Sequence, residues 1–260
     1  MSLYEHFRRD EHPFIDQVTD WLGTVENEYR TKLTDFLDPR QQLIVTSLTG
    51  QGSSVRCAFL GGTDKAERRR ALLYPDYIEP EKELFELAAF ELDFPSKFVR
   101  LTHPQVLGAL LSLGLKRGKF GDILISSDAI QFLTCQDTAD YVEQHFREAG
   151  SAPVLPKRID LSKLRFPEEE SADIQVTVSS LRLDTVISEL YRLSRAKTKP
   201  LIQQEKVKVN WKITDDPSFR LEAGDMISVR GMGRCKVVEI GGTTRKGNTV
   251  LKAEKIGSQS

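Results

Sequence analysis

The chain has 260 residues and a formal net charge of −1, with 37 Lys and Arg against 38 Asp and Glu. Hydrophobic residues make up 39% of it and charged residues 29%, which is ordinary for a globular protein and argues against a chain that coats nucleic acid along its whole surface. No apolar run approaches the roughly 18 residues of a membrane span, and the three cysteines stand apart without a CxxC pair, which argues against a zinc site or a disulfide framework. We therefore expect a cytoplasmic protein that contacts no membrane and uses no metal or other cofactor.

The first 80 residues predict helices followed by a hairpin. An apolar stripe at helical spacing begins at Phe14, and we extend the helical prediction over residues 1–38, up to Pro39. Two short apolar runs, Leu43–Leu48 and Val55–Leu60, then predict the two strands of a hairpin.

A basic segment follows this predicted hairpin. The pair Gly61-Gly62 precedes Arg68, Arg69 and Arg70. A glycine pair before basic residues can cradle phosphate, although the spacing is not that of a P-loop. Two interpretations stay open: a turn that enters a charged helix, and a second RNA contact made by the three arginines.

Residues 81–165 predict the order strand, helix, strand, strand, helix, strand. The predicted elements are Leu84–Leu92, Gln105–Leu115, Asp122–Ser126, Ile130–Cys135, Thr138–Ala149 and Pro153–Ile159. This β-α-β-β-α-β order is that of the ferredoxin-like fold, which many RNA-recognition domains share with unrelated enzymes, so the fold alone assigns no function. The loop behind the first helix supplies further candidate RNA contacts, with a plain solvated loop as the alternative: Lys116, Arg117 and Lys119.

Residues 166–173 predict an acidic linker, because three glutamates follow Pro167. Behind it, the segment 174–260 carries the strongest functional pattern of the chain. Residues 181–245 hold 13 Lys and Arg against 8 Asp and Glu, an excess of five positive charges. A basic end on a near-neutral protein indicates local binding of nucleic acid.

Three consecutive elements make up this basic region. An apolar stripe from Leu183 to Tyr191 predicts a helix, and Ser194 predicts the N-cap of a second helix, with Arg195 beside its free backbone amides. Such a helix start attracts phosphate. Residues Lys206–Lys212 alternate basic or polar with apolar, which predicts a strand with its basic side outward. The candidate RNA-binding residues are Arg182, Ser194, Arg195, Lys197, Lys199, Lys206, Lys208, Asn210 and Lys212.

The ordered combination R-L-D-T-V-I, S-R-A-K, K-V-K-V-N and A-G-D-M-I-S-V-R-G resembles the RNA-binding domain of small-subunit ribosomal protein S-four. Further motifs extend the resemblance along the chain, and together they are similar to the YlmH family of bacteria. These motifs are Tyr4–Phe7, Thr34–Pro39, Gly61-Gly62 with Ala66-Glu67-Arg68, Gly121–Ile123 and Val207–Trp211.

The resemblance implies both a fold and a role. The fold is α+β: an N-terminal helical region with a hairpin in residues 1–80, a ferredoxin-like middle domain in 81–165, and an S-four-type RNA-binding domain with a tail in 174–260. The implied role is that of a monomeric, non-catalytic protein that binds rRNA and tRNA on a large ribosomal subunit still holding peptidyl-tRNA. There it supports a nascent-chain tailing factor in adding alanine to the stalled chain. The family's genes also lie among cell-division genes, which leaves a division-linked interaction protein as an alternative.

An RNA-modifying enzyme is the other alternative, because many pseudouridine synthases carry an S-four-type module and an R-L-D catalytic motif. Here Arg182-Leu183-Asp184 follows Leu181 rather than a glycine, and the run expected behind such a motif is missing. Asp184 also opens the predicted helix, where a carboxylate favours the helix dipole. We therefore interpret Asp184 as structural or orienting and assign no catalytic residue.

Overall fold

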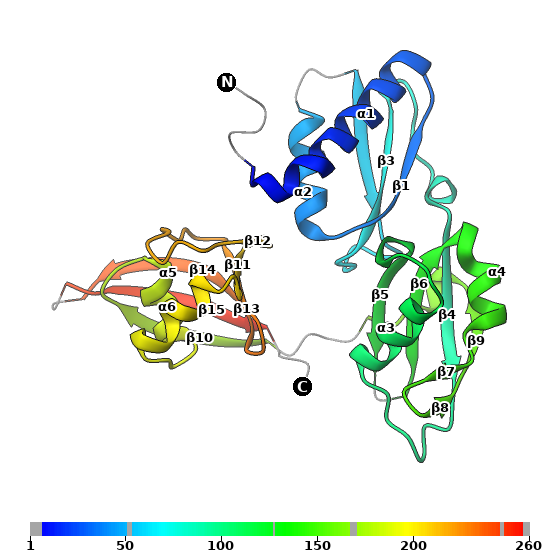
Figure 1. Cartoon of the computed structure of the whole chain (residues 1–260). Helices are drawn as coiled ribbons and strands as arrows, with labels where there is room; N and C mark the ends of the chain where they lie inside the picture. The colour runs from blue at the N-terminus through cyan, green and yellow to red at the C-terminus, as the bar shows by residue number, and fades with distance from the viewer. Residues whose placement is uncertain (1–6, 51–53, 127, 167–170, 245–246, 257–260) are drawn as a thin grey trace. The chain divides into compact units, whose positions relative to one another are not determined.

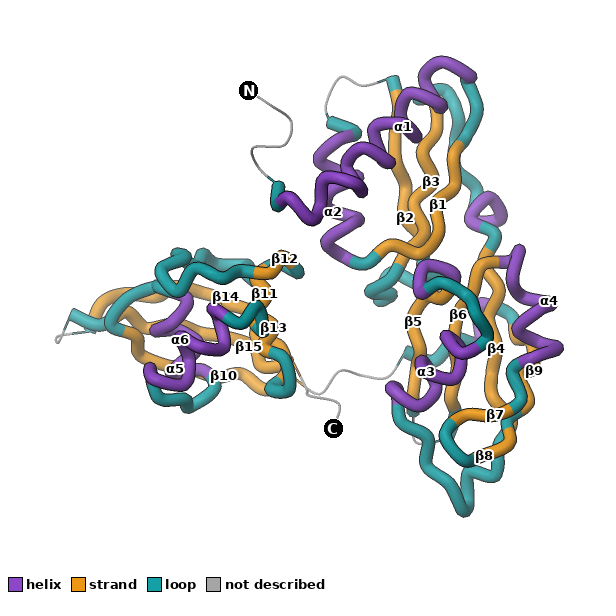
Figure 2. The backbone as a smooth tube through the Cα atoms, viewed as in Figure 1, coloured by secondary structure: helices purple, strands orange, loops and turns teal. Residues whose placement is uncertain are grey.

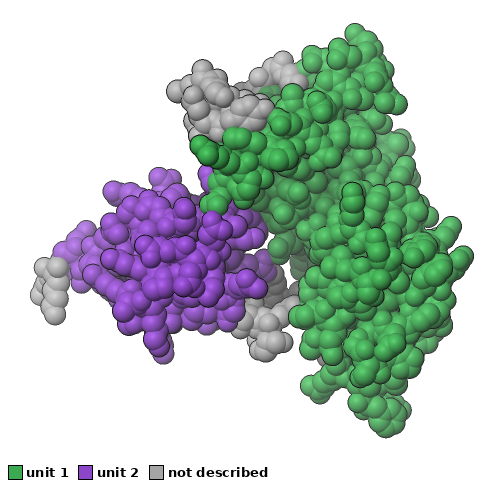
Figure 3. Space-filling model, in the orientation of Figure 1, with its two compact units in different colours: residues 1–167 green, residues 168–260 purple. Residues whose placement is uncertain are grey.

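The structure is a computed structural model of the chain, and it describes residues 7–50, 54–126, 128–166, 171–244 and 247–256. The chain divides into two compact units, residues 1–167 and 168–260 (Figure 3). Most of the Tyr4–Phe7 motif and residues 167–170 of the expected linker lie outside the described residues. None of the described helices is long and apolar enough to cross a membrane.

The N-terminal part of the first unit is a three-stranded antiparallel sheet with two helices packed against it (Figure 1). The strand order is β1-β3-β2. Val18 and Val25 of the first helix share a buried core with Val45 of the second helix and Leu73 of the central strand. The elements are a 3-10 turn at Arg9–Glu11, α1 His12–Glu28, β1 Lys32–Leu37, α2 Pro39–Leu48, β2 Val55–Leu60 and β3 Arg69–Pro75.

Two predictions for this part of the chain are wrong. Residues 32–37 form strand β1 rather than a continuation of the helix. The helix ends because Tyr29 adopts the left-handed region (φ 53), a usual way to stop a helix. Arg69 and Arg70 likewise begin strand β3 instead of a charged helix.

The predicted hairpin strand Leu43–Leu48 is also wrong, because these residues belong to helix α2. Asp38 caps that helix: its carboxylate accepts the Gln41 N–H at 2.8 Å, and the Gln41 side chain accepts the Asp38 N–H at 2.9 Å. Pro39 occupies the first turn, where its missing N–H costs nothing. This start signal outweighs the strand preference of the β-branched run Ile44–Thr46.

The second part of the first unit is a four-stranded antiparallel sheet of order β5-β6-β4-β9. The six predicted elements are present in the predicted order, and the last strand lies at the edge of the sheet. The predicted helix Thr138–Ala149 is too long, because α4 ends at His145 and Glu148–Ala149 form a strand. The elements are β4 Leu87–Asp93, α3 His103–Ser112, β5 Phe120–Ile125, β6 Ile130–Cys135, α4 Gln136–His145, the small hairpin β7 Glu148–Ala149 and β8 Ala152–Pro153, and β9 Leu155–Ile159. Short 3-10 turns lie at Lys82–Phe85, Arg117–Lys119 and Leu161–Lys163.

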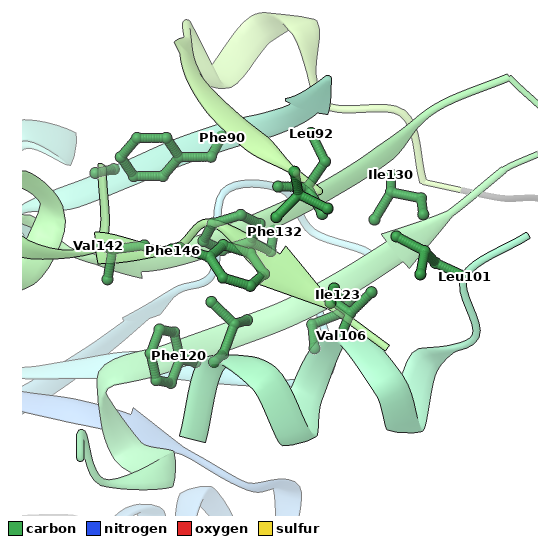
Figure 4. Packing of buried hydrophobic residues seen from close by; sticks show 14 of the residues in the cluster. Phe90, Leu92, Leu101, Val106, Phe120, Ile123, Ile130, Phe132, Val142 and Phe146 are labelled. Carbon is green, nitrogen blue, oxygen red and sulfur yellow. The ribbon is translucent and has the colours of Figure 1, made fainter. Parts of the chain in front are cut away.

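Helices α3 and α4 pack on one face of this sheet over an aromatic core (Figure 4). Phe90 and Phe132 stack with their ring centroids 5.3 Å apart, and Phe146 meets Phe132 edge-on at 5.8 Å. Val106 of α3 and Val142 of α4 are fully buried among them. Each such side chain contributes roughly 1.5–3 kcal/mol by its burial, so this core holds the helices to the sheet.

The other face of the sheet is covered as well. All six residues of β6 are buried, which requires packing on both sides of the strand. On the second side, Leu133 and Cys135 cluster with Phe36 of β1, and Leu164 packs against them. A Cβ at Gly62 would come within 2.8 Å of the Leu133 and Leu164 side chains, so the backbone can lie this close only as glycine.

The second unit is a six-stranded antiparallel sheet of order β10-β15-β14-β13-β11-β12, with two helices against it (Figure 2). Leu183 and Ile187 of the first helix and Ile202 of the second are fully buried with Val207 and Val237 of the sheet. Both helices are therefore confirmed. The elements are β10 Ser171–Val178, α5 Leu183–Leu190, α6 Arg195–Gln203, β11 Val207–Val209, β12 Lys212–Ile213, β13 Met226–Val229, β14 Gly233–Thr243 and β15 Thr249–Ile256.

Two boundaries in this unit differ from those predicted. Residues 206–212 form two short strands instead of one, because Asn210 (φ 49) and Trp211 (φ 63) turn the chain between β11 and β12. Two consecutive positive φ values belong to a tight hairpin turn. Residues 171–173 lie in β10 rather than in a linker, since Ser171 already pairs with Ile256.

Candidate nucleic-acid interface

The start of helix α6 gathers the basic residues of the second unit. Ser194 is the N-cap, as predicted: its backbone is extended (φ −72, ψ 148), and its carbonyl accepts the N–H groups of Lys197 and Thr198. Arg195 and Lys199 lie four residues apart and so share one face of the helix. Thr198 between them is fully buried, and its hydroxyl donates to the Ser194 carbonyl at 3.1 Å.

These two side chains line an open pocket of about 420 Å³. The pocket lies where strand β10 ends and the two helices begin. Its lining combines three cationic side chains, one carboxylate and three hydroxyls: Ser179, Ser180, Arg182, Asp184, Thr185, Arg195, Ala196 and Lys199. With one carboxylate against three cations, the pocket keeps an excess of two positive charges. Hydroxyls and cations around a helix start form a suitable site for an anion.

Arg182 and Asp184 form a two-point ion pair in the wall of this pocket. The Asp184 carboxylate accepts from Arg182 Nε at 3.1 Å and from Nη2 at 2.9 Å. The pair holds the pKa of Asp184 below its usual range, because the Arg182 guanidinium donates to the ionised form. Asp184 is only 7% exposed, whereas the Arg182 side chain is 47% exposed. The carboxylate therefore orients an arginine that stays accessible.

Hydroxyls complete the pocket, and the pattern of basic residues in the sequence does not point to them. Ser179 Oγ accepts from Arg195 Nη2 at 3.2 Å, and the Ser180 and Thr185 hydroxyls lie 3.1 Å apart. The serine pair Ser179-Ser180, one residue ahead of the R-L-D motif, is the signal in the sequence, because it falls at the junction of a strand and a helix.

Lys206 and Lys208 lie on a different surface from the pocket. Val207 and Val209 point into the core that α5 and α6 share, so the alternation of the strand turns Lys208 to the opposite face of the sheet. There Lys208 is opposite Ser228, and Ser228 is opposite Arg234. Lys206, just before the strand, is exposed. The structure thus divides the predicted cluster between two faces.

Asn210 lies in the hairpin turn between β11 and β12, and Lys212 begins β12. The Asn210 side chain donates to Asp225 Oδ1 at 2.8 Å and accepts the Met226 N–H at 2.9 Å, so both ends of its amide are used within the fold. Lys212 is half-buried in β12. Lys197 is exposed on α6 and lies outside the residues that line the pocket.

The candidate arginines at the start of β3 bind backbone carbonyls. Arg70 is 5% exposed and donates to the carbonyls of Thr34, Phe85 and Glu86 at 2.7–2.9 Å. Burial lowers the pKa of Arg68, whose guanidinium donates to the Phe36 carbonyl at 2.9 Å. Arg70 therefore cannot reach RNA, and Arg68 joins strand β1 to strand β5, because its Nε also donates to the Phe120 carbonyl at 3.2 Å.

The remaining candidates of this unit differ in exposure. Arg117 donates to the Phe120 carbonyl at 2.6 Å, and burial lowers its pKa to about 10, so it is still charged at neutral pH. Arg69 donates to the carbonyls of Asp64 and Ala66. Lys119 forms ion pairs with Asp35 and Asp137. Of the three candidates in this loop, Lys116 is exposed, and Arg117 and Lys119 are half-buried.

Comparisons with known proteins assign a domain family to the middle part of the chain and to its C-terminal part. The family model described as "Putative RNA-binding domain in YlmH" matches residues 80–163, and the one described as "S4 domain" matches residues 181–227. The chain is 49% identical over 248 residues to the ribosome-associated protein quality control protein P2 of Bacillus subtilis (strain 168), covering 94% of this chain and 95% of that protein.

A solved structure supports the same assignment. The cell division protein ylmH from Streptococcus pneumoniae is 31% identical and superimposes with a TM-score of 0.54, covering 62% of this chain and 98% of that one. The pocket therefore lies at the start of an S4 domain, and its residues Arg182, Asp184 and Arg195 fall within the matched range. The identity over nearly the full length of both proteins, together with the two domain matches, shows that this chain belongs to the YlmH family.

Proposed function

We propose that this protein is a non-catalytic RNA-binding factor of ribosome-associated quality control, and that RNA phosphates bind in the pocket at the start of α6. The observation that carries the proposal is the convergence of Arg182, Arg195 and Lys199 on one open pocket of an S4 domain. The name of the Bacillus subtilis relative supplies the cellular process.

The pocket suits phosphate for three physical reasons. The first backbone N–H groups of α6 have no partner within the helix, and the helix dipole adds a partial positive charge at that end. Arg195 and Lys199 stand on the same side of this helix end. Arg182 is held in orientation by Asp184 and so loses little freedom when it binds. A site with so few charges predicts binding that weakens strongly with salt.

We propose that the RNA is rRNA and tRNA on a large ribosomal subunit that still carries peptidyl-tRNA. In that place the protein would act beside the nascent-chain tailing factor while alanine is added to the stalled chain. The basic row on the outer sheet face, with Lys208 and Arg234, supplies a second surface on the same unit. Two separate surfaces favour a protein that lies between two RNA elements.

We also propose the three-part division of the chain, with boundaries near residues 80 and 166, and a ferredoxin-like middle domain. In sequence order, the strands of the middle sheet run fourth, first, third, second, all antiparallel, with both helices packed on one face. That arrangement supports the ferredoxin-like assignment.

An RNA-modifying enzyme is disfavoured by the surroundings of Asp184. A nucleophilic carboxylate must reach a substrate atom, but both oxygens of Asp184 accept hydrogen bonds from Arg182, and the residue is 7% exposed. A division-linked role is the second candidate function, because the Streptococcus pneumoniae chain bears a cell-division name. Loss of septal placement in cells that keep normal ribosome association would favour that candidate.

The pocket is tested by co-sedimentation of the whole protein with large ribosomal subunits. We expect the Arg195→Ala/Lys199→Ala variant to bind about 10- to 100-fold more weakly, and its log affinity to fall less steeply with log salt, by about two units of slope. Lys197→Ala is the matched control, since it removes a lysine from the same helix outside the pocket. If Lys197→Ala, which removes one charge instead of two, lost about half as much in log affinity as the pocket variant, only the total charge of the helix would matter.

A further inference from the structure

The middle domain matches an RNA-binding family model, but its sheet has no face on which bases could stack. RNA-recognition domains of similar topology stack bases on aromatic side chains of the open sheet face. Here the central strand β6 is buried along its whole length, and Leu133 of that strand packs against Phe36 and Leu164. A base that stacks on this domain must therefore find its aromatic partner outside the central strand of the sheet.

The loop between β4 and α3, residues 94–101, presents the most exposed large hydrophobic side chain among the described residues. Phe98 is 88% exposed. Its neighbours in the loop are anchored: Leu101 is 5% exposed in the aromatic core (Figure 4), and Phe94 and Val99 pack against that core from its edge. The loop is thus fixed at both ends, with a single aromatic ring directed outward.

Backbone hydrogen bonds fix the turn that carries the exposed ring. The N–H groups of Phe98 and Val99 donate to the Pro95 carbonyl at 3.0 and 3.1 Å, which closes one tight turn. Pro95 restricts its own backbone, and the Phe94 carbonyl accepts the Ser96 N–H at 2.7 Å. A ring carried on such a turn loses little conformational entropy when it binds a flat partner.

The charges of this loop favour a nucleic acid over an apolar protein surface. Lys97 and Arg100 flank Phe98, and both are exposed. The loop sequence contains no carboxylate, and the nearest one along the chain, Asp93, is paired with Lys157 at 2.7 Å. Two cations beside one exposed aromatic ring match a base next to its flanking phosphates.

We infer that loop 94–101 is a second RNA-binding site, in which Phe98 stacks on an unpaired base while Lys97 and Arg100 contact the neighbouring phosphates. The inference rests on the proposed RNA-binding function, but it uses a surface in the other unit of the chain. It assigns to the middle domain a stacking residue outside its sheet.

The first test compares the affinity of whole-protein variants for purified large ribosomal subunits. Phe98→Ala and Phe98→Leu are expected to bind about tenfold more weakly, and Phe98→Trp to bind like the wild type, because stacking needs a ring and not merely an apolar side chain. Tyr77→Ala is the matched control, since Tyr77 is another aromatic of this unit and is 66% exposed.

A photo-crosslinking residue at position 98 then identifies what the ring touches on the subunit. A crosslink to an unpaired nucleotide supports the inference. A crosslink to a ribosomal protein, or full binding by Phe98→Leu, overturns it in favour of an apolar protein contact.

The pocket variant Arg195→Ala/Lys199→Ala, measured in parallel, separates the two proposals. If it loses binding while Phe98→Ala does not, only the loop inference falls. If neither variant loses binding, the proposed function falls with it.

Discussion

The basic cluster at Arg68–Arg70 in the first unit and the one at Arg195–Lys199 in the second unit are similar in sequence but have different surroundings in the fold. Arg68 and Arg70 point inward and saturate backbone carbonyls between strands. Arg195 and Lys199 point into an open pocket beside a helix start. A cluster of basic residues thus indicates RNA only where the fold leaves the charges accessible, because a planar guanidinium also serves to join chain segments through their carbonyls.

The largest expected effect tests the structural half of this comparison. Arg70→Ala removes the guanidinium donor from the carbonyls of Thr34 and Phe85 and one of two donors from the Glu86 carbonyl, which still accepts the Gln136 N–H at 2.8 Å. We therefore expect the free energy of unfolding of the first unit to fall by about 3–5 kcal/mol. Urea denaturation measures it, and Arg56→Ala, an exposed arginine of β2, is the control with an expected change within about 0.5 kcal/mol. A stable Arg70→Ala protein with weakened RNA binding would reverse the comparison.

An intermediate effect is expected at Asn210, which looks like an RNA contact in the sequence but has a structural role in the second unit. Asn210→Ala removes the bonds to Asp225 and Met226 and places alanine at φ 49, which together should cost about 2 kcal/mol of stability. Asn210→Gly, which accepts the positive φ but still lacks the amide, should fall between alanine and the wild type in thermal unfolding. RNA affinity below the melting temperature should stay unchanged, and a selective loss of affinity would return Asn210 to the interface.

The smallest effect concerns the pH dependence of the Arg182–Asp184 pair. The folded pKa of Asp184 lies below its usual value of about 4, so the pair stabilises the folded protein at higher pH, and this contribution is lost as the pH falls through the lowered pKa. Asp184→Asn should therefore lower stability by about 1 kcal/mol at neutral pH and by less in acid. Urea denaturation over a pH series measures the difference, and a constant difference at every pH would contradict the assignment.

The sequence alone predicted the helices of the second unit and all six elements of the middle domain, because their apolar spacing is regular and their cores are local. It also located Ser194 as the N-cap of α6. The strand β1 and the helix α2 were not predictable in the same way, since their apolar residues are compatible with both structures. The Asp38 cap determines where helix α2 begins, and the left-handed conformation of Tyr29 ends the first helix ahead of β1.

For the candidate site, the sequence predicts which residues are basic but not which surface of the folded unit each side chain faces. Period two correctly turns Lys208 away from Val207 and Val209, but nothing in the spacing shows that this face is remote from the α6 pocket. The inward arginines depend on carbonyls far away in the sequence: Arg70 and Thr34 are 36 residues apart, and Arg68 and Phe120 are 52 apart. Contacts of this kind exist only once the sheets are assembled.

The order of the strands in the second unit also sets an order of events during synthesis. Strand β10 pairs only with β15, which is made about 70 residues later and lies between β10 and β14. The sheets of the first unit, in contrast, have all their described strands once Ile159 has been made. The first unit can therefore fold while the chain is still growing. Strand β10, whose end forms one wall of the pocket at the start of α6, has its partner strand only once Thr249–Ile256 has been made, so this wall is among the last parts of the fold to be completed.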